Sequence, residues 1–119
     1  MSSIHTTWGY VAVVINGLVG VWGLLAATRN RAPVSFYWGV GVAIVVLLAQ
    51  VVLGAVLLSQ GSEPGDQHTF YGVVIAVTFS FVYIYRAQFR QRPALYYGLL
   101  LLFTMGLGIR GIMTFGLDF

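Results

Sequence analysis

The chain has 119 residues, of which 59% are hydrophobic and 8% are charged, and it contains no cysteine. Soluble domains carry about 25% charged residues, so the composition excludes a water-soluble fold, and it is too apolar for a disordered chain. It indicates an integral membrane protein, with the lipid bilayer as an expected partner. At about 20 residues per span, the length allows four membrane helices and no separate catalytic domain. The lack of cysteine excludes disulfides and thiolate metal sites.

Four apolar runs follow one another along the chain, at about residues 7–28, 34–58, 69–85 and 94–115. Because lipid offers the backbone no hydrogen-bond partners, each run is expected to be a helix that crosses the bilayer. Pro33 and Pro93 fall in the expected first turn of a helix, where proline is tolerated. The predicted fold class is an all-α integral membrane four-helix bundle, with residues 1–119 forming one transmembrane domain.

Arginine marks the two ends of this bundle. The first and third connections between the runs hold five of the six basic residues, namely Arg29, Arg31, Arg86, Arg90 and Arg92, whereas residues 59–67 hold none. The positive-inside rule predicts a multi-pass protein of the plasma (inner) membrane with both termini extracytoplasmic. The N-terminal residues lack the positive start of a signal peptide, so the first run is expected to be retained. Since the net charge of +3 comes from arginines beside the spans, no nucleic-acid partner is expected.

The chain contains an internal repeat. Residues 5–9 read His-Thr-Thr-Trp-Gly, and residues 68–72 read His-Thr-Phe-Tyr-Gly. The arginine turns also repeat, because residues 29–31 and 90–92 each read Arg-x-Arg and each precede a proline. We therefore expect two related helical hairpins, with the only two histidines at the same depth near the outer face.

This histidine pair predicts a cofactor. Imidazole is an axial ligand for haem iron, so His5 and His68 are predicted to hold a b-type haem between the first and third helices. Gly9 and Gly72 lie one helical turn further on, on the same face as each histidine, and would leave room for the porphyrin edge. Two alternatives stay open: the histidines are merely interfacial, or the glycines serve close helix packing.

Three further polar residues fall within the expected spans. Arg110 lies toward the outer end of the last run, where it would pair with a haem propionate, reach lipid headgroups, or pair with Asp118 or Glu63. Gln50 and Asn16 are expected mainly to hydrogen-bond between helices, with approach to a cofactor or quinone as the alternative. The hydroxyls of Thr78, Ser80 and Thr104 can bond to their own helices and indicate no function.

The pattern resembles one four-helix half of the haem A synthase family, circularly permuted. It rests on His5, residues 50–54 (Gln-Val-Val-Leu-Gly), His68 and residues 108–110 (Gly-Ile-Arg) in the last helix. The resemblance implies haem ligation by His5 and His68, with Arg110 near a propionate. The family's glutamate shortly before the first histidine is absent from residues 1–4, and so are its cysteine pair and second half. Oxidation of the haem methyl group is therefore not implied.

These observations predict a small membrane cytochrome-like subunit for electron transfer or haem handling. Other membrane subunits, a homodimer or a quinone are its expected partners. The alternative is a cofactor-free structural subunit of a larger membrane complex. A complete haem-modifying enzyme is disfavoured, because the catalytic acid is missing.

Overall fold

A computed structural model describes residues 2–29 and 31–118 of the chain. Its elements, in chain order, are α1 (Ser2–Thr28), α2 (Val34–Ser59), α3 (Asp66–Ile84), α4 (Arg86–Phe89) and α5 (Pro93–Met113). Every regular element of the described residues is helical, which confirms the all-α class. The long helices begin at or before the predicted apolar runs, because helical hydrogen bonding continues into the polar turns at the membrane surface. The single turn of α4 lies in a connection for which no helix was predicted.

The four long helices are long and apolar enough to cross a membrane, and they make a bundle of 47 × 25 × 21 Å. Many large apolar side chains point outward, including Leu18 and Trp38, which are 67% and 74% exposed. Water would penalise such a surface, whereas lipid tails accommodate it. The bundle is therefore that of a multi-pass membrane protein.

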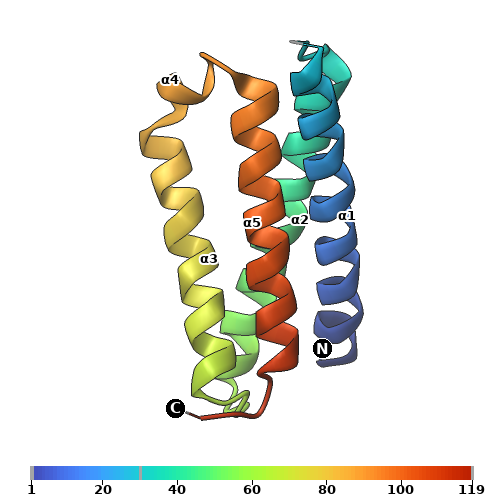
Figure 1. Cartoon of the computed structure of the whole chain (residues 1–119). Helices are drawn as coiled ribbons and strands as arrows, with labels where there is room; N and C mark the ends of the chain where they lie inside the picture. The colour runs from blue at the N-terminus through green and yellow to red at the C-terminus, as the bar shows by residue number, and fades with distance from the viewer. Residues whose placement is uncertain (1, 30, 119) are drawn as a thin grey trace.

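The helices run alternately up and down, with α1 and α3 at diagonal corners of the bundle (Figure 1). α5 packs between them and contacts both. The most extensive packing joins α1 to α5, which belong to different sequence hairpins, rather than α1 to its neighbour α2.

Glycine explains this close α1–α5 packing. A Cβ atom placed on Gly23 would lie 2.7 Å from the Gly98 Cα atom, and one on Gly98 would lie 3.0 Å from the Leu24 backbone nitrogen. A Cβ atom on Gly20 would lie 3.1 Å from the Leu102 backbone nitrogen. The two backbones thus touch directly, as small residues allow in membrane helix pairs. We call the contact between Gly20, Gly23 and Gly98 the glycine crossing.

A buried polar link lies near the middle of the bundle. The Asn16 side chain is fully buried, and its Nδ2 atom donates to the carbonyl oxygens of Ala12 at 2.8 Å and Ala43 at 3.1 Å. Its Oδ1 atom accepts from the Thr104 hydroxyl at 2.9 Å. The interhelical bonding predicted for Asn16 is confirmed. The Thr104 prediction was incomplete, because its hydroxyl joins α5 to α1 as well as bonding the Leu101 carbonyl of its own helix.

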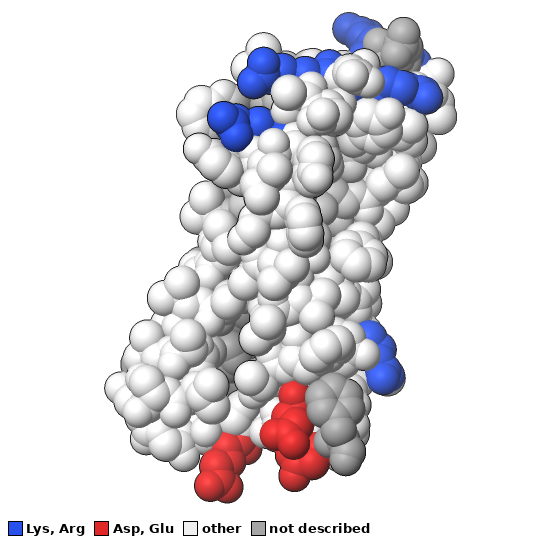
Figure 2. Space-filling view, turned by 90° about the vertical axis from the view of Figure 1, so that its left-hand side faces the viewer, with Lys and Arg blue, Asp and Glu red and all other residues white. Residues whose placement is uncertain are grey.

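Charge separates the two ends of the bundle (Figure 2). One end, here the arginine end, carries the five arginines of the α1–α2 and α3–α5 connections: Arg29, Arg31, Arg86, Arg90 and Arg92. The opposite end, here the histidine end, carries His5, His68, Arg110 and all three acids, Glu63, Asp66 and Asp118. The acids and the arginines other than Arg110 are therefore separated between the two ends of the bundle.

Candidate functional site

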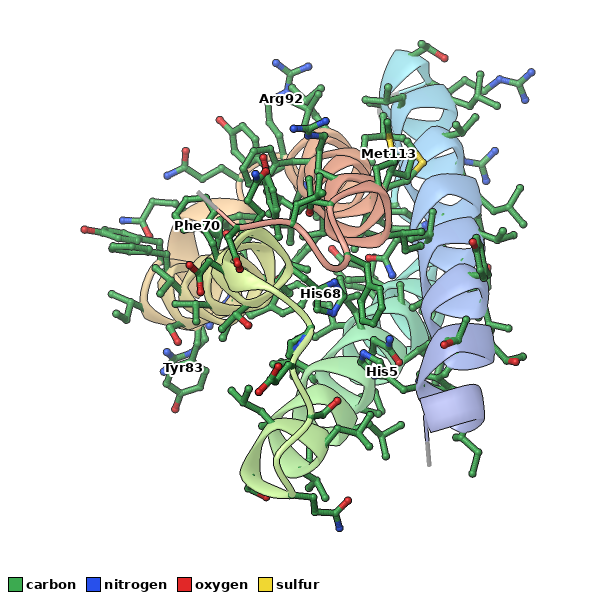
Figure 3. All side chains as sticks on the ribbon, turned by 90° about the horizontal axis from the view of Figure 1, so that it is seen from below. His5, His68, Phe70, Tyr83, Arg92 and Met113 are labelled. Carbon is green, nitrogen blue, oxygen red and sulfur yellow. The ribbon has the colours of Figure 1, made fainter. Side chains whose placement is uncertain are left out.

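The two histidines meet inside the histidine end. His5 lies near the start of α1 and His68 in the first turn of α3. Figure 3 views the bundle from this end and shows both side chains lying between the helices. The ring centroids are 5.9 Å apart, and the ring planes are inclined by 80°. Two residues far apart in sequence are thus brought together from diagonal helices.

The His68 ring is held by backbone. Its Nδ1 atom lies 2.7 Å from the carbonyl oxygen of Gly111 on α5. A carbonyl only accepts, so Nδ1 carries the proton and Nε2 presents its lone pair. Phe115 also contacts the His68 ring, with the ring centroids 5.2 Å apart in an edge-on arrangement. Donation from Nδ1 to a carbonyl is the usual way in which proteins orient a metal-ligating histidine.

The His5 ring is less well satisfied. The Gln50 amide nitrogen on α2 donates to the His5 carbonyl oxygen at 2.8 Å and lies 3.4 Å from His5 Nε2, which is long for a hydrogen bond. Among the described residues, the buried side-chain atoms without a hydrogen-bond partner are His5 Nδ1 and Gln50 Oε1. Such atoms cost about 1–3 kcal/mol each. Both lie in the candidate site, where a ligand or water could partner them.

The glycines at this end differ in what lies beside them. A Cβ atom on Gly54 would lie 3.1 Å from His5 Cε1, and one on Gly9 would lie 3.0 Å from Gln50 Nε2. The space beside Gly9, expected for a porphyrin edge, thus holds the Gln50 amide. A Cβ atom on Gly72 would meet no atom within 4 Å. The sequence placed Gly54 in the motif at residues 50–54 but did not predict its approach to His5, although its spacing of one turn from Gln50 indicates a shared helix face.

Arg110 lies at the level of this site but on its outer surface. The side chain is exposed, its Nε atom lies 3.4 Å from the Tyr71 hydroxyl, and its guanidinium carbon lies 5.8 Å from the Tyr71 ring centroid. The sequence analysis did not predict Tyr71 as the contact. The Arg110 side chain therefore lies on the outer surface between α3 and α5 and does not enter the bundle beside the histidines.

The C-terminal residues 114–118, here the strap, close the histidine end. Gly116 donates its backbone N–H to the Pro64 carbonyl at 2.6 Å, and Gln67 donates its backbone N–H to the Leu117 carbonyl at 3.0 Å. The Asp118 carboxylate accepts from the Asp66 backbone N–H at 3.0 Å, at the start of α3. The strap thereby fixes the first turn of α3, which carries His68, and places Phe115 against its ring.

The donor set restricts what the site can hold. The described residues contain no group of three or more His, Cys, Asp or Glu side chains that could bind a metal ion. Protein-bound zinc takes three or four protein ligands, and the histidine pair supplies two. Two imidazoles suit an iron whose remaining ligands come from a macrocycle.

Comparison of the chain with models of protein families, with curated proteins and with solved structures found no match.

Proposed function

We propose that the protein is a four-helix membrane haem protein, with His5 and His68 as the two axial ligands of a b-type haem at the histidine end. The observation that carries the proposal is the approach of the only two imidazoles from diagonal helices to a centroid separation of 5.9 Å. An iron held by the pair would take one imidazole nitrogen from each ring.

The surroundings of the rings support the proposal. The Gly111 carbonyl sets His68 with Nε2 as the acceptor, and His5 Nε2 has only a long contact with Gln50. Gly54 lets the α2 backbone approach the His5 ring, and Gly72 leaves open space beside it on α3. A bound haem would supply one-electron redox chemistry. The chain's own residues would orient the imidazoles, exclude water through Phe115 and the strap, and offer Arg110 at the rim to a propionate.

In this proposal the protein transfers electrons or handles haem as a subunit, with a partner subunit, a second copy of the chain or a quinone at the histidine end. The resemblance to one half of a haem A synthase supports the proposed haem ligation and no other part of that family's activity. Oxidation of the haem methyl group is not proposed, because residues 1–4 contain no acid.

A second candidate is a cofactor-free structural subunit. The glycine crossing and the Asn16–Thr104 link hold α1, α2 and α5 together by packing and hydrogen bonds alone. The outward face of α2, which includes Trp38, Gly41 and Val45, is apolar and open. Such a face could pack against another membrane subunit.

One measurement separates the two candidates. The protein is expressed with ample haem and purified in mild detergent, and its reduced-minus-oxidised absorbance is recorded. The haem proposal predicts sharp α and β bands and a strong Soret peak, which disappear in the double variant His5→Ala/His68→Ala. A colourless preparation of folded wild-type protein would contradict it and favour the structural role.

We also propose that the arginine end is cytoplasmic and the histidine end extracytoplasmic in the plasma (inner) membrane. Since the chain has no cysteine, single cysteines report sidedness without background. Ser62→Cys, exposed beyond α2, should react with a membrane-impermeant thiol reagent in intact cells, and Gln88→Cys, exposed in α4, should react only after lysis. The reverse pattern would invert the topology.

A further inference from the structure

The arginine end contains a cavity of about 240 Å³ that the haem proposal does not use. It lies between the α1–α2 connection and the start of α5. The residues that form it include Ala27, Arg31, Gln91, Arg92, Ala94 and Leu95. Two guanidinium-bearing side chains from different connections thus border one small space.

The two arginines that border the cavity occupy matching positions in the internal repeat. Each Arg-x-Arg turn, at residues 29–31 and 90–92, ends on an arginine that borders the cavity, Arg31 in the first turn and Arg92 in the second. All four arginines are exposed, but the first arginine of each turn, Arg29 or Arg90, is not among the cavity residues. In both turns, therefore, the second arginine borders the cavity and the first does not.

The charge at this end is not neutralised within the bundle. The three acids of the chain all lie at the histidine end. Arg86 rests on the Tyr83 ring, with its guanidinium carbon 4.3 Å from the ring centroid. Arg31 and Arg92 thus line the cavity without a carboxylate at their end of the described bundle.

The size and position of the cavity indicate its ligand. Pockets for drug-sized molecules measure about 300–1,000 Å³, so a cavity of about 240 Å³ suits a compact group. It lies where the membrane-spanning segments that end at Thr28 and begin at Pro93 reach the surface. Its wall of Ala27, Ala94 and Leu95 is apolar, and its polar contributors are arginine and glutamine. A headgroup with an attached apolar tail matches this combination.

We propose that this cavity binds the phosphate group of an anionic phospholipid, held by Arg31 and Arg92. Guanidinium groups bind phosphate oxygens through paired, charge-assisted hydrogen bonds, and basic pockets at the ends of membrane helices bind acidic lipid headgroups. The lipid would tie the α1–α2 connection to the start of α5. The site lies at the opposite end from the histidine pair and does not depend on haem.

The test measures lipid retention by the purified full chain. Protein in detergent is incubated with phosphatidylglycerol or phosphatidylcholine, and bound lipid is counted by native mass spectrometry. The cavity variant Arg31→Gln/Arg92→Gln is compared with the matched control Arg29→Gln/Arg90→Gln, which removes the same charge from the same turns. We expect the cavity variant to lose about tenfold in phosphatidylglycerol affinity, because it loses hydrogen bonds between charged groups. The control should lose less than about threefold, because exposed charge pairs are weak.

A second variant keeps the test informative if the first does not fold. Arg31→Lys/Arg92→Lys retains the charge but not the paired donors, so its affinity should fall by about threefold. Equal losses in the cavity variant and its control would overturn the proposal, because they would indicate diffuse attraction to the whole arginine end. Equal retention of both lipids by the wild type would also overturn it. Displacement of the lipid by millimolar inorganic phosphate would assign the site to a free anion and contradict the lipid.

Discussion

The two ends of the bundle are built on different principles. Toward the arginine end, Gly23 and Gly98 bring the α1 and α5 backbones into direct contact. At the histidine end, helices meet through polar groups, and His5 Nδ1 and Gln50 Oε1 are buried without partners. Close backbone packing joins the helices in the first region. The second has buried polar groups that a bound molecule would satisfy, so the closest helix packing and the proposed site lie at different ends of the bundle.

The largest expected effect tests the packed region. Gly23→Ala places a Cβ atom 2.7 Å from the Gly98 Cα atom, and the backbones must part. We expect a loss of about 1–3 kcal/mol in the free energy of unfolding, measured by steric trapping in micelles. Gly41→Ala is the matched control, because its Cβ atom would meet nothing within 4 Å, and both changes gain the same helix propensity. Equal stabilities of the two variants would contradict a stabilising role for the glycine crossing.

A smaller effect is expected in the polar link between the two regions. Thr104→Val keeps the side-chain shape but removes the hydroxyl that donates to Asn16, so the variant should lose about 0.6–1.7 kcal/mol in the same unfolding measurement. Thr78→Val is its control, since the Thr78 hydroxyl bonds only the Val74 carbonyl of its own helix. If Thr78→Val is as destabilised as Thr104→Val, the interhelical bond contributes nothing of its own.

The smallest effect is expected at the strap, on the histidine side of the comparison. Asp118→Asn removes the negative charge from the start of α3, where the helix dipole favours an anion, and should cost about 0.3–1 kcal/mol at low salt. Hydrogen exchange at the Asp66 and Gln67 amides should speed up. Glu63→Gln is the control, because it removes a charge from the exposed connection nearby. It should leave the exchange rates of these amides unchanged. Acceleration by both variants alike would mean that general charge, not the Asp118 contact, protects the turn.

Composition and repetition were enough to predict much of this molecule. The apolar runs predicted four membrane helices, because each is long enough and lipid demands internal hydrogen bonding. The histidine repeat placed both imidazoles at one depth, and helix direction then brought them together. Asn16 was predicted to bond between helices, because a buried amide in lipid needs a partner.

Other features could not be read from the sequence. Glycines occur on several helix faces, so their pattern did not tell that α1 would pack most closely on α5. Thr104 carried no signal alone, since a threonine hydroxyl usually bonds its own helix. The strap depends on backbone bonds between residues 114–118 and the α2–α3 connection, and backbone groups carry no sequence identity. The Tyr71 contact of Arg110 likewise required the relative rotation of α3 and α5.

The central claim, that His5 and His68 share one iron, is tested most directly by the spin state of bound haem in single variants. The account predicts low-spin, six-coordinate haem in the wild type, and loss of that signature in both His5→Ala and His68→Ala, by electron paramagnetic resonance and absorbance. If both variants keep full haem content and the low-spin spectrum of the wild type, the paired-histidine site is contradicted.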